Sequence, residues 1–176
     1  MKIKKFSIAV QVILLHIFFL LLHYSFDWWP SAFTKVFSGI DESVYQHMKI
    51  GFFSVLLLVV LEYLVTRPHI QDQKTWFTAR LFTCSFLPLV MMPIYLSGPL
   101  FFGQIETILG EVIFANIALA VTSLISFVTQ EQIEQAAPKV LFMILVAALF
   151  LLSAAQYITF TYRLPWFDIF AIPPGW

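Results

Sequence analysis

Apolar residues in this chain form five long runs, separated by short segments that hold most of the charged residues, prolines and glycines. A helix needs about 20 consecutive apolar residues to cross the hydrocarbon core of a bilayer, which is about 30 Å thick. The pattern therefore predicts five transmembrane helices, at about residues 6–25, 41–66, 76–96, 104–129 and 139–162. These helices leave no room for a soluble domain. We predict an all-α integral membrane bundle with short loops, in which residues 1–176 form a single transmembrane domain.

The segments between the runs carry the usual marks of a membrane surface. Trp28 and Trp29 follow the first run, and aromatic residues of this kind collect where lipid meets water. Residues 31–37 predict a short surface helix, which Gly39 ends. Ser97-Gly98-Pro99 predicts the turn after the third run, and the aromatic, proline-rich residues 163–176 predict an interfacial tail.

Composition agrees with this class of protein. Hydrophobic residues make up 60% of the chain and charged residues 11%, and the mean hydropathy is +0.87. Soluble domains average about 45–50% apolar and about 25% charged residues. A formal net charge of zero leaves no basic patch for nucleic acid. Cys84 is the single cysteine, so an intrachain disulfide or thiolate metal cage is excluded, and its apolar neighbours predict a packing position.

The basic residues predict the orientation in a cell membrane. The N-terminal run starts like a secretory signal but lacks a small-x-small cleavage site, so we expect it to stay as the first span. With five spans, seven basic residues fall on one side and three on the other. The larger set is Lys2, Lys4, Lys5, Arg67, Lys74, Arg80 and Lys139; the smaller is Lys35, Lys49 and Arg163. The positive-inside rule places the N-terminus in the cytoplasm and the C-terminus outside.

Two predicted helices carry a stripe of small and polar residues, which usually marks the surface where transmembrane helices touch. The stripes are Ser43, His47, Gly51, Ser54 and Glu62 in the second span, and Glu111, Ala115, Ala118, Thr122 and Ser126 in the fourth. If the stripes face each other, His47 and Glu111 approach at the outer end. Glu111, placed about two turns inside its span, is costly in lipid, and a functional role is the default interpretation of such a residue.

These residues predict an outward-facing polar site. Its candidate ligands are Glu42, His47, Glu111 and His23, with Ser43, Glu106 and Gln156 in support. Carboxylates and imidazoles bind zinc and other divalent metals, and they also relay protons. The chain has no recognisable catalytic motif, so neither a reaction nor the presence of a metal follows from the residues.

Structural roles are an alternative for several polar residues. Asp41 suits a helix N-cap and Lys49 can snorkel to the surface. Glu62 is placed to pair with Arg67 at the cytoplasmic interface. His16 is expected to pack within the bundle, and Glu106 to lie at the water boundary.

Residues 41–49 carry a resemblance to a known family. Asp41-Glu42-Ser43-Val44-Tyr45-Gln46-His47-Met48-Lys49 resembles a segment Asn-Glu-Ser-x-Trp-Glu-His-x-Lys, which recurs in a family of small polytopic prokaryotic membrane proteins of unknown function. Four of its residues match, and Asp41, Tyr45 and Gln46 replace the Asn, Trp and second Glu. The resemblance implies the topology and a site to test, and supplies no reaction.

Three functions remain open from the sequence. In the first, the site binds a metal, a cation or a lipid-derived ligand and acts on it. In the second, the chain is a non-catalytic accessory subunit of a larger membrane complex. The third, a proton- or cation-coupled carrier, requires a homo-oligomer, because five helices leave little room for alternating access.

Overall fold

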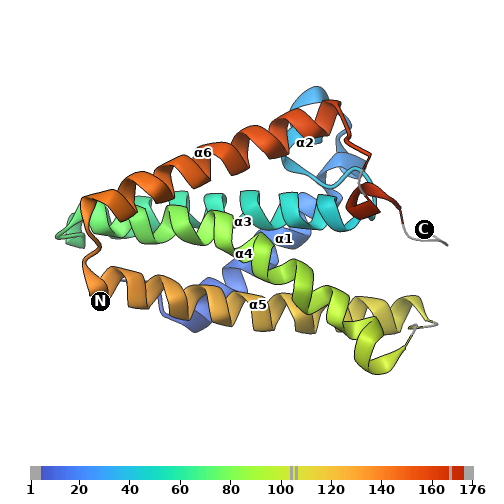
Figure 1. The fold of residues 1–176 in the computed structure, drawn as a ribbon, viewed down its shortest axis with the longest axis horizontal. Coiled ribbons are helices and arrows are strands. Elements are labelled where there is room, and N and C mark those ends of the chain that lie inside the picture. The colour runs from blue at the N-terminus through green and yellow to red at the C-terminus, as the bar shows by residue number, and fades with distance from the viewer. Residues whose placement is uncertain (1–4, 104, 106, 167, 173–176) are drawn as a thin grey trace.

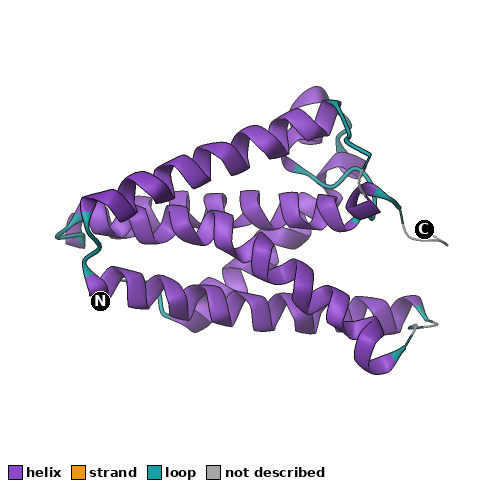
Figure 2. Ribbon diagram, viewed as in Figure 1, coloured by secondary structure: helices purple, strands orange, loops and turns teal. Residues whose placement is uncertain are grey.

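The computed structural model describes residues 5–172 of the chain, apart from residues 104, 106 and 167, and the described part is helical with no strand (Figures 1 and 2). Its α-helices are α1 (Ile8–Trp28), α2 (Ala32–Phe37), α3 (Val44–Thr66), α4 (Gln73–Phe102), α5 (Ile108–Ala136) and α6 (Val140–Tyr162). Two short 3₁₀ helices, η1 (Arg67–His69) and η2 (Asp168–Phe170), follow α3 and α6. The five long helices are long and apolar enough to cross a membrane, which confirms the predicted all-α multi-pass fold.

Hydroxyl side chains start four of these helices. Ser7, Ser31, Ser43 and Thr107 lie just before α1, α2, α3 and α5, and each accepts a hydrogen bond from a first-turn backbone N–H. These bonds satisfy donors that a helix start leaves unpaired. The cap of α3 is therefore Ser43. Asp41, expected to be that cap, instead accepts a hydrogen bond from the Ser43 N–H, at 2.9 Å.

Helix boundaries differ from the sequence-based spans at several places; α5, for example, covers Ile108–Ala136 where 104–129 was expected. The second helix begins at Val44, so residues 41–43 precede it. The turn predicted at Ser97-Gly98-Pro99 is wrong, because α4 continues through it to Phe102. Gly98 is buried there, and a Cβ atom at Gly98 would overlap the Phe114 ring of α5. This close approach of α4 and α5 explains why a glycine occurs inside a helix.

Four of the long helices form a ring. Helix α1 packs against α3 and α5, while α4 packs against α3 and α5 from the other side. Helix α6 lies outside this ring (Figure 1), in contact with α4, and its aromatic residues pack on Tyr45 and Phe52 of α3. The inward stripe of α1 is Gln11, Leu15, Phe19 and His23, at four-residue steps.

The ring has two ends that differ in chemistry. We call them the α2 end, where α1 ends and α3 and α5 begin, and the η1 end, where α3 ends and α4 begins (Figure 1). Between them, Leu15, Leu58 and Leu87 are buried, as is Cys84, at the packing position that the sequence predicted. The buried charged residues, Lys49, Glu62 and Arg80, therefore lie toward the two ends.

Candidate functional site

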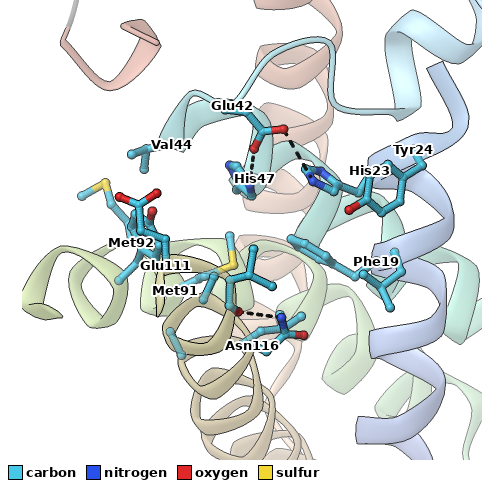
Figure 3. A pocket seen from close by; sticks show the side chains of 16 residues that line it. Phe19, His23, Tyr24, Glu42, Val44, His47, Met91, Met92, Glu111 and Asn116 are labelled. Carbon is cyan, nitrogen blue, oxygen red and sulfur yellow. Dashed lines mark hydrogen bonds and ion pairs between the residues drawn. The ribbon is translucent and has the colours of Figure 1, made fainter. Parts of the chain in front are cut away.

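A pocket of about 220 Å³ opens at the α2 end of the ring (Figure 3). All four ring helices contribute to its wall, and residue 42, just before α3, closes part of it. Its polar groups include His23, Glu42, His47 and Glu111, whereas Phe19, Met91 and Leu119 supply apolar surface. The pocket is thus apolar along much of its wall, with titratable groups gathered at one place.

Three of the predicted ligand residues meet in this pocket. The Nε2 atom of His23 lies 3.6 Å from Oε1 of Glu42, and the Nε2 atom of His47 lies 3.4 Å from Oε2. Figure 3 shows both imidazoles pointing toward the carboxylate, one from α1 and one from α3. If one ligand atom is taken from each of the three residues, these atoms all lie within 4.8 Å of one another. The fold therefore brings residues 23, 42 and 47 into one cluster, which we call the His/Glu cluster.

Local structure fixes the orientation of His47. Its Nδ1 atom lies 2.9 Å from the backbone carbonyl oxygen of Ser43, one turn earlier on α3. A carbonyl oxygen only accepts, so Nδ1 must carry the proton. In neutral His47 the Nε2 atom then presents a lone pair to the Glu42 carboxylate. A lone pair facing a carboxylate is repulsive unless a proton or a cation lies between the two atoms.

Aromatic packing holds the two imidazoles in place. The ring of Phe19 lies 6.4 Å from the His23 ring and 6.3 Å from the His47 ring, and the two imidazoles are 5.3 Å apart between centroids. Tyr24 packs on the edge of His23 at 4.8 Å. These contacts restrict the rings from the apolar side, so that the Nε2 atoms stay turned to the carboxylate.

The cluster has nearly the dimensions of a tetrahedral metal site. Zinc bonds of about 2.0–2.1 Å at a tetrahedral angle place neighbouring ligand atoms about 3.4 Å apart. The two histidine–glutamate distances are close to this spacing, although they run to different oxygens of the Glu42 carboxylate. With one ligand atom per residue, the three atoms lie within 4.8 Å of one another, so a small inward movement of the side chains would complete the site. The Nδ1 hydrogen bond of His47 to a backbone carbonyl is also the support that metal-binding histidines commonly receive. The residues present therefore fit a divalent metal.

Glu42 lies outside the membrane-spanning helices, and its charge state is set by its neighbour. When His47 is protonated on both ring nitrogens, its hydrogen bond to Glu42 is the largest influence and lowers the pKa of the Glu42 carboxyl, and the positive potential of His23 adds to it. Partial burial opposes the shift. Glu42 is therefore an anion near neutral pH, as a metal ligand or an ion-pair partner must be.

Glu111 lines the same pocket but lies outside the His/Glu cluster (Figure 3). The sequence placed it two turns inside a span, whereas α5 begins at Ile108 and Glu111 lies in its first turn. A carboxylate is favourable at that position because the helix dipole is positive there. Its depth therefore does not by itself demand a function, and its role in the site stays a prediction.

The supporting residues have different positions. Ser43 caps α3 and accepts the His47 hydrogen bond with its carbonyl, so it supports the cluster. Gln156 does not line the pocket: its side chain is exposed on α6, and its backbone carbonyl accepts a hydrogen bond from Tyr45. Glu106 lies outside the described residues. Lys49 does not snorkel; it is fully buried and donates to the Lys35 carbonyl and the Thr161 hydroxyl.

A second polar cluster lies at the η1 end, and the sequence analysis missed it. Arg80 of α4 is fully buried and donates to both carboxylate oxygens of Glu62, at 3.1 and 3.3 Å, and to Glu134 at 2.6 Å. Lys5 pairs with Glu134 and Glu131. Glu62 thus pairs with Arg80 rather than with the expected Arg67. The sequence did contain a signal for this cluster. Arg80 lies within an apolar run, and an arginine in such a place needs an acidic partner.

The chain was compared with protein families, curated proteins and solved structures. The model of a family of unknown function, DUF6512, matches residues 1–172. No curated protein and no solved structure matches. The chain therefore belongs to DUF6512, which confirms the expected membership of a family of unknown function.

Proposed function

We propose that this member of DUF6512 binds a divalent metal ion at the His/Glu cluster, on the outer side of a cell membrane. The observation that carries the proposal is the bond from His47 Nδ1 to the Ser43 carbonyl, which turns the Nε2 lone pair toward the Glu42 carboxylate. A cation placed between these atoms removes their repulsion. Two imidazoles and one carboxylate form a ligand set typical of zinc.

The split of basic residues supports the outer location. Five membrane-spanning helices would put the α2 end and the η1 end on opposite sides, and Lys5, Arg67, Lys74 and Lys139 all belong to the η1 end. Under the positive-inside rule the η1 end faces the cytoplasm. The pocket then opens at the outer surface.

Three protein ligands leave one position of a tetrahedral ion open to the pocket. Zinc bound in this way takes water or a substrate oxygen in the fourth position and lowers the pKa of bound water. The role of the protein residues is to supply the ligands, to orient them through Ser43 and Phe19, and to keep one side of the ion apolar. The chemistry supported is metal-assisted binding of an oxygen-bearing ligand.

Metal content of the purified protein tests the proposal. We expect the full-length chain in detergent, stripped with a chelator and then given Zn²⁺, to bind one ion per chain. His23→Ala and His47→Ala should each weaken binding by at least about tenfold, since each removes a ligand. His16→Ala is the matched control, because His16 lies on α1 with the same Nδ1-to-carbonyl bond but outside the cluster.

The opposite result is equally informative. If the wild-type chain binds no divalent ion, or if His16→Ala weakens binding as much as His23→Ala, the metal proposal is wrong. A histidinium of His47 paired with Glu42 then accounts for the geometry. The accessory-subunit function becomes the better interpretation in that case.

A further inference from the structure

We propose that a phospholipid from the outer leaflet enters the pocket sideways, between α1 and α5, and directs a phosphate oxygen to the His/Glu cluster. This inference rests on the proposed metal site and names the ligand class that the site takes. It is carried by the shape of the pocket and by the residues at its rim.

The pocket opens toward lipid between two helices. Leu20 and Tyr24 of α1 and Val112 of α5 line the pocket, yet 46%, 46% and 45% of their surfaces are exposed. Asn116 of α5 also lines the pocket and is exposed. Exposed faces of transmembrane helices contact acyl chains rather than water. The rim formed by these four residues is therefore an opening into the bilayer.

Asn116 is an unexpected residue at such a rim. Its Nδ2 atom donates to the Val112 carbonyl at 2.7 Å, and within the described part of the chain its Oδ1 atom accepts no hydrogen bond. A polar group exposed to hydrocarbon without a partner is costly. A hydroxyl or ammonium group of a phospholipid headgroup, at the same depth, would supply the missing donor.

The pocket has a polar part and an apolar part, as the binding site of an amphipathic ligand would. The His/Glu cluster offers a metal position for an anionic oxygen, and Phe19, Met91 and Leu119 offer apolar surface beside it. A free phosphate ion would bind the metal but leave this apolar surface and the lateral opening unused. The volume of about 220 Å³ lies below the range of about 300–1,000 Å³ for pockets that enclose a drug-sized ligand. The headgroup region therefore enters, and the acyl tails remain in the bilayer.

Ala115 provides the test, because its small side chain on α5 leaves the space that the headgroup needs. The experiment uses zinc-loaded full-length protein in detergent, to which phosphatidylglycerol is added, with retention measured by native mass spectrometry and zinc measured in the same samples. We expect Ala115→Phe to weaken phosphatidylglycerol binding by at least about tenfold while zinc stays bound. Ala148→Phe is the matched control, since Ala148 lies exposed on α6, away from the pocket.

Asn116→Leu is a second pocket variant, for the case in which Ala115→Phe disturbs folding. It replaces the asparagine by an apolar side chain of similar size. It should also weaken lipid retention without loss of zinc, and a photoactivatable phosphatidylglycerol should cross-link to the segments around Tyr24 and Asn116. Equal retention by the wild type and both pocket variants would overturn the inference. So would inorganic phosphate displacing the lipid at equal concentration, because the apolar part would then contribute nothing.

The design separates this inference from the metal proposal. Zinc binding without lipid retention would overturn the lateral entry and leave the metal site intact. Lipid retention that depends on Ala115 and Asn116 in a chain that binds no zinc would support the lateral entry and refute the metal site.

Discussion

At the residue scale, two histidines with the same local bond have different surroundings. His16 and His47 both place Nδ1 at 2.9 Å from the carbonyl oxygen four residues earlier. Only His47 has a carboxylate opposite its other nitrogen. The hydrogen bond to the backbone carbonyl fixes the proton on Nδ1. Whether a cation is needed at Nε2 depends on the residue that the fold places opposite it, which for His47 is Glu42.

Protonation of Glu42 should reduce stability at acidic pH. Its pKa is lowered in the folded protein, so its stabilising contribution is present above the ordinary value near 4.5 and is lost as pH falls through the lowered value. We expect a contribution of at most about 1 kcal/mol, because the pair is partly exposed. Thermal unfolding of the metal-free chain in detergent between pH 6 and pH 3 measures it.

The comparison with Glu42→Gln isolates this contribution from that of the other carboxylates. The wild type should lose more stability than Glu42→Gln on acidification, and the two curves should converge at the lowest pH. Parallel curves over the whole range would show that the His47–Glu42 bond does not form.

Arg80 and Glu62 should depend on each other for stability. Both side chains are buried, so Arg80→Met leaves Glu62 as an uncompensated buried charge and should cost about 3–5 kcal/mol. Glu62→Leu should cost less, because Arg80 keeps its ion pair with Glu134. The double variant should cost less than the sum, because neither charge remains unpaired. Denaturant or thermal unfolding in detergent measures the stability of the wild type, the two single variants and the double variant.

Arg67→Met is the matched control for this cycle. Arg67 is exposed at the η1 end, and the sequence alone had suggested it as the partner of Glu62. We expect a change within about 0.5 kcal/mol. Strong coupling of Glu62 to Arg67 instead of Arg80 would contradict the observed pairing.

At the scale of elements, the α4–α5 contact depends on the small size of Gly98. Gly98→Val would push a side chain into the Phe114 ring, and overpacking of this kind costs about 1–3 kcal/mol. Phe114→Ala in the same chain should recover part of the loss by making room. Melting temperatures of the two single variants and the double variant check the expectation, and strictly additive losses would rule out a direct clash.

The positions of the helices could be predicted from the sequence more reliably than the residues at which they end. The apolar runs gave the number and approximate position of the helices, since hydrophobicity along a run is a local signal. The exact starts were less predictable: the expected cap Asp41 precedes the actual cap of α3, Ser43. The end of α4 was not predictable in this way, because Ser97-Gly98-Pro99 is a turn signal by composition. The packing of Gly98 on Phe114 shows that the glycine serves helix contact instead.

At the scale of the whole molecule, five membrane spans would place Trp29 and Lys139 on opposite sides of the membrane. We expect a membrane-impermeant maleimide to label Trp29→Cys, and not Lys139→Cys, in intact cells. Both positions are exposed, and the native Cys84 is buried and should add little background. Labelling of Lys139→Cys alone would show the inverted topology, and the pocket with the His/Glu cluster would then face the cytoplasm.

The sequence by itself determined the class of this protein. Hydrophobicity over about 20 residues is a sum of local contributions, so five spans and the all-α fold followed directly. It also selected Glu42, His47, Glu111 and His23 as candidate ligands, with the cost of an ionisable residue in lipid as the argument for Glu111.

Only the tertiary structure decided which of these residues meet. The rotation of each helix about its axis is set by packing, which brings His23 of α1 to residues 42 and 47 and leaves Gln156 on the exposed side of α6. The same packing joined Arg80 to Glu62, residues 18 positions apart, and buried Lys49. Pairing between helices depends on contacts that no single run of residues encodes, which is why the pocket and both clusters became visible only in the fold.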